Sequence, residues 1–473
     1  MILLLLSLSS MPAPPAAGAP CVRPTRAGTQ VQGEVRVCPG RYRIADPNEL
    51  GIIVAAASGT RIDLSGVTLE SGDSVPNRFV GAGITSRGVD AVTISGGAVH
   101  GFRYGVRLEG GRSHRVTATD LSGSRDQAAQ ISTSRPVTTD ALDVNQPDVF
   151  ERYGGGILLR RTTGATVSGI TARGAQNGIT LMESRDSYIA DNEVTANNGW
   201  GIHLWRSSRN VIARNRAHHN RRCESQVPAK DCGAAGLLLH DASDSNTVVD
   251  NDVTASSTGV LLAGERRGVS PSVGNLIYRN DASFALQTAF AVAYGWSNTF
   301  LQNRADSSGT AFRLQHSGGS TVQGNTAIGV RTAGIVVEHG SDNAILANVL
   351  IGGPLGIRVA APEQSGEPSR RYRIDDNVLT RLQQGIVIQR TTRAQVRGNV
   401  FDGVGDGLVI DGDGHASEVT GNIFLRASGW FIEAPDLAAG GNYWATADPS
   451  TATAKVKGRI SVLPWRPASA AGY

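Results

Sequence analysis

A short phrase that repeats about every 22 residues constrains this chain more than any other feature. The phrase is a glycine, an aliphatic residue, any residue and a second aliphatic residue. A regular period in this range is typical of a solenoid, in which each repeat buries its apolar side chains against the next. Copies start at Gly83, Gly105, Gly156, Gly178, Gly201, Gly236, Gly259, Gly334, Gly356, Gly385 and Gly407, and weaker copies start at Ala128, Ala289 and Ala311.

Within one repeat the pattern predicts short β-strands. After Gly201, Ile202 and Leu204 alternate with His203 and Trp205, and turn residues follow. Period-two patches of three to five residues separated by Ser, Asn and Gly indicate strands, and no segment keeps a helical period over three turns. Aromatic residues make up only 5% of the chain and glycine is 58 of 473 residues, so we expect an aliphatic core with frequent turns.

Asparagine gives the second signature of the repeat. We expect these asparagines to occupy one corner of each coil, to tolerate left-handed backbone geometry there and to bond to the asparagines above and below. Ligand binding is the weaker interpretation, because the asparagines keep a fixed register in repeats that otherwise differ. Pairs five residues apart are Asn210/Asn215, Asn246/Asn251, Asn275/Asn280, Asn298/Asn303 and Asn343/Asn348. Single asparagines at the second position of the pair are Asn192, Asn325 and Asn399.

These phrases, together with Gly440-Gly441-Asn442-Tyr443-Trp444 and the entry segment Val37 to Ile44, resemble the right-handed parallel β-helix superfamily. The repeat type is similar to that of NosD-like periplasmic proteins and of many carbohydrate-binding and sugar-cleaving proteins. The resemblance covers residues 37–445 and implies an all-β, right-handed parallel β-helix of about 14 coils with caps at both ends. It implies little about activity, because this scaffold hosts many unrelated functions.

The expected domain plan has four parts. Residues 1–20 are expected to be a secretory signal, because Ile2 to Leu8 is a short apolar run followed by small residues. Residues 21–50 are expected to cap the solenoid, residues 51–441 to form the β-helix, and residues 442–473, with Trp444 and Trp465, to cover the other end. The mature protein is expected to be secreted or periplasmic.

The four cysteines fall into two local pairs. Cys21 is near Cys38, and Cys223 is near Cys232. In an oxidising compartment each pair is expected to form a disulfide that closes a short loop. A zinc site would need a tighter pair of cysteines or paired histidines, so no metal is expected.

Charge excludes some partners. The net charge is +4, and only three of the 45 basic residues are lysines, with no basic run of the kind that grips nucleic acid. No later segment reaches 18 unbroken apolar residues, so no membrane span is expected. The acidic turn Asp411-Gly412-Asp413-Gly414 lacks the rest of a calcium loop, so no cofactor is expected. We expect the protein to be a monomer and its partner to be a polysaccharide, with acidic polysaccharides among the candidates.

Stacking the repeats by their glycines gives a candidate site. The third, fifth and sixth residues of neighbouring repeats form columns spaced about 4.8 Å apart. The insertion from His218 to Cys232 is expected to wall one side of this groove. Three adjacent coils place acids, bases, a cation and an indole together. The candidate catalytic residues are His203, His240, Glu183 and Asp241. The candidate substrate-binding residues are Trp205, Arg206 and, on the preceding coil, Arg161.

Three functions remain open from the sequence. The first is a polysaccharide lyase, epimerase or glycoside hydrolase, with Arg206 as the cation and His203 or His240 as the base. The β-helix mannuronan epimerases carry an Asp-Pro-His-Asp motif, and the corresponding stretch His203 to Arg206 matches none of its four residues. The second is a non-catalytic glycan-binding module. The third is a NosD-like accessory factor, although no thiolate or thioether cluster suits copper.

Overall fold

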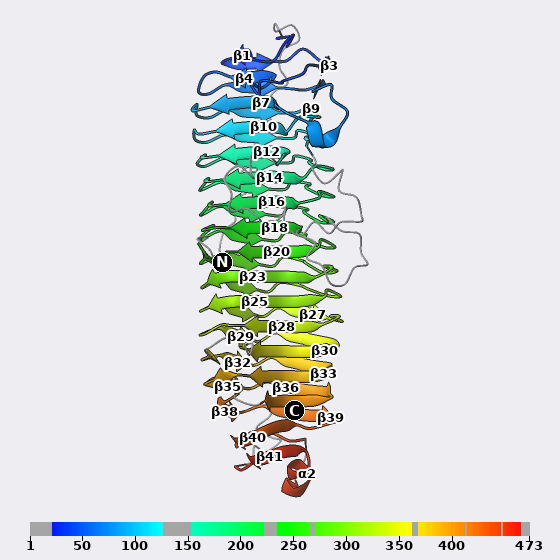
Figure 1. The fold of residues 1–473 in the computed structure, drawn as a ribbon, viewed down its shortest axis with the longest axis vertical. Coiled ribbons are helices and arrows are strands. Elements are labelled where there is room, and N and C mark those ends of the chain that lie inside the picture. The colour runs from blue at the N-terminus through cyan, green and yellow to red at the C-terminus, as the bar shows by residue number, and fades with distance from the viewer. Residues whose placement is uncertain are drawn as a thin grey trace, which may run out of the picture.

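The computed structural model describes residues 21–125, 153–221, 234–264, 270–361, 368–411, 414–445 and 448–464. Within these residues the chain forms a long rod of short parallel strands stacked one above another (Figure 1). The expected signal segment, the pair Cys223 and Cys232, Asp413 and Trp465 lie outside the described residues.

Two long parallel sheets form most of the rod. The main sheet has 21 strands, and the second sheet has 15. The main sheet contains β1 (Thr29–Val31), β4 (Ile53–Ala55), β7 (Ala82–Arg87), β10 (Tyr104–Glu109), β12 (Gly155–Arg160), β14 (Asn177–Met182), β16 (Trp200–Trp205), β18 (Ala235–His240), β20 (Thr258–Ala263), β21 (Ser272–Val273), β23 (Thr288–Trp296), β25 (Thr310–Gly318), β27 (Thr326–Ile328), β28 (Ala333–Glu338), β30 (Val349–Ala360), β33 (Val378–Gln389), β36 (Val400–Val404), β37 (Asp406–Asp411), β39 (Ile423–Ala427), β40 (Ile432–Ala438) and β41 (Val456–Ser461).

The second sheet runs along another side of the rod. Its strands are β2 (Glu34–Arg36), β5 (Arg61–Asp63), β8 (Thr93–Ser95), β11 (Arg115–Thr117), β13 (Thr166–Ser168), β15 (Tyr188–Ala190), β17 (Val211–Ala213), β19 (Thr247–Val249), β22 (Leu276–Tyr278), β24 (Thr299–Leu301), β26 (Thr321–Gln323), β29 (Ala344–Leu346), β32 (Arg373–Asp375), β35 (Ala394–Arg397) and β38 (Ala416–Thr420). Smaller elements are β3 (Gly40–Arg43), β6 (Val67–Glu70), β9 (Ala98–His100), β31 (Ser369–Arg370), β34 (Thr391–Thr392), the 3-10 helix η1 (Pro76–Arg78) and the helix α2 (Pro449–Thr453).

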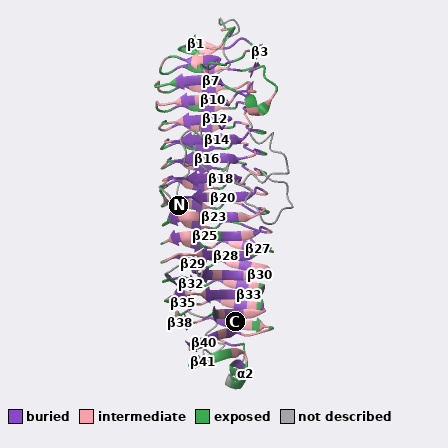
Figure 2. Cartoon of the chain, viewed as in Figure 1, coloured by how far each residue is buried: buried purple, intermediate pink, exposed green. Residues whose placement is uncertain are grey.

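The core is a set of aliphatic columns that run along the rod. Ile157 pairs with Ile179, Ile179 with Ile202, Ile202 with Leu237, and Leu237 with Val260. All five side chains are fully buried. Figure 2 shows buried strands along the length of the rod, with exposed residues mostly at the turns. The observed architecture confirms the predicted right-handed parallel β-helix and the inward register of the repeat.

Two asparagine ladders stabilise the corners of the coils. In the longer ladder each side-chain amide donates to the side-chain oxygen of the asparagine in the next coil, and the asparagines are buried. Because these amides also bond to backbone groups, the ladder satisfies polar atoms that would otherwise be buried without partners. The longer ladder runs through Asn192, Asn215, Asn251, Asn280, Asn303, Asn325, Asn348, Asn377, Asn399, Asn422 and Asn442, and a shorter one links Asn210, Asn246, Asn275 and Asn298.

The predicted left-handed conformation of these asparagines is wrong. The left-handed residue is instead the one before each asparagine, such as Arg214 at φ 52°, Asp250 at φ 56° and Arg279 at φ 52°. Turning the backbone one residue earlier directs the asparagine amide into the coil, where it reaches its neighbours. The preceding side chain is left on the surface.

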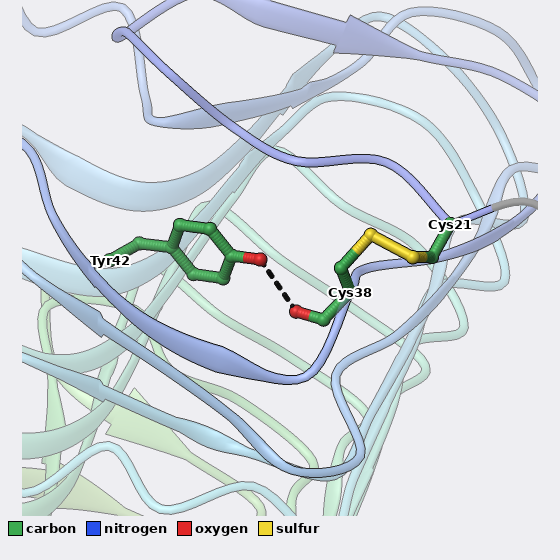
Figure 3. The surroundings of a disulfide bond; sticks show 3 residues. All are labelled: Cys21, Cys38 and Tyr42. Atoms are coloured by element: carbon green, nitrogen blue, oxygen red, sulfur yellow. Dashed lines mark hydrogen bonds between the residues drawn. A yellow bond between two sulfur atoms is a disulfide. The ribbon is translucent and has the colours of Figure 1, made fainter.

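Regular strand pairing extends beyond the expected limits of the β-helix. Strand β1 lies within residues 21–50 and already pairs in parallel with β4. At the other end β41 pairs with β40, well past residue 441. The predicted disulfide between Cys21 and Cys38 is present, and the Tyr42 hydroxyl donates to the Cys38 carbonyl at 2.7 Å (Figure 3).

Aromatic rings close the C-terminal end of the core. Phe401 stacks on Phe424 with ring centroids 4.6 Å apart, and Phe424 stacks on Trp444 at 5.0 Å. Trp444 is fully buried. Among the described residues, no helix has the length and apolarity needed to cross a membrane.

Candidate functional site

The outer face of the main sheet carries a second buried layer over part of its length. This layer is separate from the solenoid core and follows the outward positions of strands β7 to β20. The outer face of these strands is therefore largely covered, whereas the sequence predicts an open groove there. Arg87, Arg107 and Arg160 remain partly exposed on this face. The members of the layer are Ala82, Tyr104, Tyr153, Leu158, Met182, Trp200, Trp205, Ala235, Leu238 and Ala263.

Three of the candidate residues lie in or beside this layer. His203 is 0% exposed, His240 is 2% exposed and Trp205 is 8% exposed. The His203 ring lies 4.5 Å from the Trp200 ring and 6.2 Å from the His240 ring, measured between centroids. Their position on the outer side agrees with the stacking argument, but in this conformation a ligand in solvent does not reach them. The reason is that neighbouring outward positions, such as Leu238, are apolar and pack together.

Burial changes the titration of both histidines. Desolvation, and then the nearby His240, lowers the pKa of His203 well below its ordinary value. Desolvation lowers the pKa of His240 to about 4, although the charge of Asp241 opposes the shift. Both imidazoles are therefore neutral at pH 7, which is the state that a general base requires.

The charged candidates form two separate ion pairs at the corner beside this layer. Arg161 Nε lies 2.6 Å from a Glu183 oxygen, and Arg206 Nε lies 2.6 Å from an Asp241 oxygen. The Arg206 guanidinium also lies over the Trp205 ring, 4.4 Å from its centroid. The structure thus pairs each of the two acids with one arginine.

Further along the same face, strands β25 to β37 carry an open polar band. On each of these coils at least one of the outward third and fifth positions holds a polar side chain that is half-buried or exposed, and the other positions include the apolar Val336, Ala360 and Val387. Arg313 Nη2 donates to Glu338 at 3.1 Å, and Gln315 Nε2 donates to the same carboxylate at 2.8 Å. Burial raises the pKa of Glu338, but hydrogen bonds and charge from Gln315 and Arg313 outweigh it and lower the pKa.

The polar band continues over the next coils. Arg358 Nε donates to Gln389 at 2.9 Å, and Gln389 Nε2 donates to Asp411 at 3.1 Å. We refer to Arg313, Gln315, Glu338, Arg358, Gln389 and Asp411 as the polar band. These residues were missed by the sequence reasoning, although the third and fifth columns contain them. The repeat pattern shows which positions point outward and does not show which of them remain uncovered.

Three stacked rings border the polar band at the corner. Tyr294 stacks on His316 with centroids 4.3 Å apart, and His316 stacks on His339 at 4.4 Å. They occupy the same corner position as Arg161 and Glu183 in earlier coils, and each has a positive φ. Around this corner Trp296 is 42% exposed and lies over Gly318.

A separate open groove lies near the C-terminal end. Its lining includes Arg381, Arg426, Lys455 and the backbone of Gly403 and Gly405. The carboxylate of Asp402 holds Arg426, and the Lys455 ammonium donates to two backbone carbonyls. Two of its three cations thus already have partners.

Comparison with protein families gives two matches. Residues 54–284 match the family described as periplasmic copper-binding protein (NosD), and residues 235–424 match the right-handed beta helix region. Among the described residues, no three His, Cys, Asp or Glu side chains are grouped so that they could hold a metal ion. No curated protein matches the chain.

Several solved structures are similar to this chain. The Azotobacter vinelandii mannuronan C-5 epimerase AlgE6 A-module has 12% identity and a TM-score of 0.46, with 84% of this chain and 91% of that chain covered. The Dettilon tailspike protein has 16% identity and a TM-score of 0.46, with 69% and 61% covered. The periplasmic alginate epimerase AlgG has 14% identity and a TM-score of 0.42, with 76% and 77% covered. The repeat, the parallel sheets and the two family matches place this chain in the right-handed parallel β-helix superfamily.

Proposed function

We propose that the protein is exported and binds an extended polysaccharide along the outer face of the main sheet. The observation that carries this proposal is the polar band of strands β25 to β37. It presents amide, guanidinium and carboxylate groups on successive coils, at a spacing of about 4.8 Å. Such planar groups bond pairs of hydroxyls, and a regular row of them suits a ligand that is itself a repeating chain.

The register of the band supports an axial ligand. Arg313 faces Val336, and Val336 faces Arg358, so the two arginines lie two coils apart, about 10 Å along the rod. This is close to the length of an extended disaccharide. In the fifth column, Gln315 lies on the same strand as Arg313, and Glu338 lies on the strand between the two arginines. A glycan lying along the rod would therefore meet two equivalent guanidinium groups about one disaccharide apart.

Binding is measured by calorimetric titration against a panel of neutral and acidic oligosaccharides. We expect Gln315→Ala to weaken the best ligand about tenfold, because a bound hydroxyl loses its partner and Glu338 loses a donor. The matched control is Arg279→Ala, which removes an exposed side chain on the second sheet that is paired with Asp250. Equal affinities for the wild type and Gln315→Ala would contradict binding at this band.

A second candidate function is proton abstraction from a uronate by His203 or His240. It is favoured by the neutral state of the two buried imidazoles beside Arg206 and Asp241. In a lyase the imidazole would take the C5 proton, the electron pair would form the C4–C5 double bond, and the C4–oxygen bond would break. The freed oxygen would then take a proton.

This second candidate requires the outer layer over strands β14 to β18 to open, because His203 is fully buried. In such an open state Trp205 and Arg206 would contact the sugar, and Arg161 would lie two coils away along the same corner. Glu183 and Asp241 would be the carboxylates of a hydrolase, but each is held by an arginine at 2.6 Å. The test is incubation with polyuronates and detection of unsaturated product. A rate that is the same in wild type and His203→Gln would rule out this base.

A further inference from the structure

A cluster of arginines lies on the same outer face, around strands β10 and β12, far from the polar band. Arg103 and Arg107 both contact the carboxylate of Glu49, at 2.9 and 3.5 Å. Arg107 also contacts Glu109 at 2.7 Å, and Arg160 lies 3.8 Å from the same carboxylate. These contacts hold the guanidinium groups of neighbouring coils close together.

Two more arginines complete the cluster. Arg87 lies 3.1 Å from Glu109, and Arg125 Nη1 donates to the Phe79 carbonyl at 3.3 Å. Four of these five arginines contact the two carboxylates Glu49 and Glu109, and Arg125 contacts neither of them. Among the described residues the cluster therefore has an excess of three positive charges. We refer to Arg87, Arg103, Arg107, Arg125 and Arg160 as the arginine cluster.

The other described groups near the cluster do not neutralise this excess. The Asp46 carboxylate accepts the backbone N–H groups of Leu50, Gly51 and Ala82, and it forms no ion pair with an arginine in the described part of the chain. Burial raises the pKa of Tyr104 to about 12, so its hydroxyl stays protonated and adds no negative charge. Burial, and then the charge of Arg103, lowers the pKa of Arg125, as expected for cations crowded together.

The cluster also has unused donors. The Nε–H groups of Arg103, Arg125 and Arg160 are buried and meet no acceptor among the described residues. The side chains of Arg103 and Arg107 are each 18% exposed and that of Arg160 is 35% exposed, so solvent still reaches the cluster. Guanidinium groups that are partly desolvated bind carboxylate or sulfate strongly, with two parallel hydrogen bonds. Unpaired like charges in such a position destabilise the free protein, and a bound anion would relieve this cost.

We propose that the arginine cluster binds one oxyanion group, a carboxylate or a sulfate. The further statement that this carboxylate or sulfate is part of an acidic glycan rests on the function proposed above. Strands β12 and β25 are separated by six strand steps, about 29 Å. The cluster is therefore a second site on the outer face, which would fix one acidic residue of a long chain, while the polar band would hold another part of that chain.

The test variant is Arg160→Gln, because Glu109 keeps Arg107 and Arg87 as partners when Arg160 is removed. The control is Arg279→Gln, which removes one arginine of equal charge from the second sheet. The probes are sodium sulfate, an oligouronate, and the same oligosaccharide with its carboxyl groups reduced. We expect sulfate and the oligouronate to raise the Tm of the wild type and of the control.

Arg160→Gln is expected to weaken the oligouronate about tenfold and to leave the reduced oligosaccharide unchanged. The loss is expected to shrink in high salt. Without ligand, Arg160→Gln is expected to be at least as stable as the wild type, because like charges are removed. A structural role for Arg160 would instead lower the Tm of the free protein, and that result would overturn the proposal.

The remaining outcomes separate the two proposals. Equal affinity of the wild type and Arg160→Gln for both sulfate and the oligouronate would overturn the oxyanion site, whether or not glycans bind at the polar band. Binding of sulfate through Arg160, with no binding of any glycan, would support the oxyanion site and contradict the proposed glycan-binding function.

Discussion

Truncation of one ladder asparagine, Asn280→Ala, should destabilise the solenoid strongly. The Asn280 side-chain oxygen accepts the backbone N–H and the side-chain amide of Asn251, both at 2.9 Å. Its side-chain amide donates to Val248, Tyr278 and Asn303 at 2.9 to 3.2 Å. All of these bonds are lost together in the alanine variant.

The expected size of the effect follows from which groups lose their partners. The backbone N–H of Asn251 is buried and loses its acceptor, which costs about 1–3 kcal/mol, and each further buried hydrogen bond contributes about 1 kcal/mol. Several of the other groups keep a second partner; the amide of Asn251, for example, still donates to Ile212. The free energy of unfolding should therefore fall by about 3–6 kcal/mol, a large part of the total for a typical domain.

The measurement is urea unfolding followed by circular dichroism, with hydrogen exchange to locate the change. Exchange is needed because a solenoid can open locally around a weakened coil. The matched control is the adjacent Arg279→Ala, an exposed residue paired with Asp250, for which a loss below about 1 kcal/mol is expected. A loss below about 1 kcal/mol in Asn280→Ala, without faster exchange near β19 and β22, would refute the structural role of the ladder.

Three further predictions concern the core, the histidines and the disulfides. Ile202→Asp should lower the free energy of unfolding by at least about 4 kcal/mol or prevent folding, because it places a carboxylate among stacked aliphatic side chains. If urea unfolding showed full stability, the register of the strand would be wrong. The pKa of His240 is about 4 in the folded state and about 6.5 in the unfolded state, so the unfolded state binds a proton first as the pH falls. The free energy of unfolding should therefore be highest above about pH 6.5 and should fall by roughly 3 kcal/mol as the pH drops toward about 4. His240→Gln should flatten this part of the pH profile, and an unchanged slope would contradict the assignment. Peptide mapping without reduction should find Cys21 joined to Cys38 and Cys223 joined to Cys232, and cross-pairing or free thiols at the second pair would disprove that pairing.

Much of the fold could be predicted from the sequence. The glycine-aliphatic phrase places Ile202 and Leu204 inward and repeats this at nearly constant spacing, so each coil finds the same partner in the next coil. The asparagine slots likewise predicted a ladder, and Cys21 and Cys38 are close enough along the chain to form a local bridge. These features depend on neighbours at a fixed separation, and a periodic sequence states that separation directly.

The candidate site depended on contacts that have no fixed separation. His203 and Trp205 point outward as the period requires, but whether they are open to solvent depends on packing of side chains such as Tyr153, which lies outside the repeat. Glu183 pairs with Arg161 because of the direction in which the two side chains leave a corner with left-handed backbone geometry. The repeat pattern does not encode this direction.

The arginine cluster shows the same limit. Arg107 and Arg160 belong to the repeat columns, but Glu49 comes from the first coils and Arg125 from the end of a turn. Only the tertiary structure brings these residues together and reveals that, in the described part of the chain, the positive charges outnumber the carboxylates that contact them. The period of the sequence determined how the backbone coils and what it buries, because those contacts repeat. Burial and charge balance on the outer face were decided by non-repeating contacts, which only the folded chain contains.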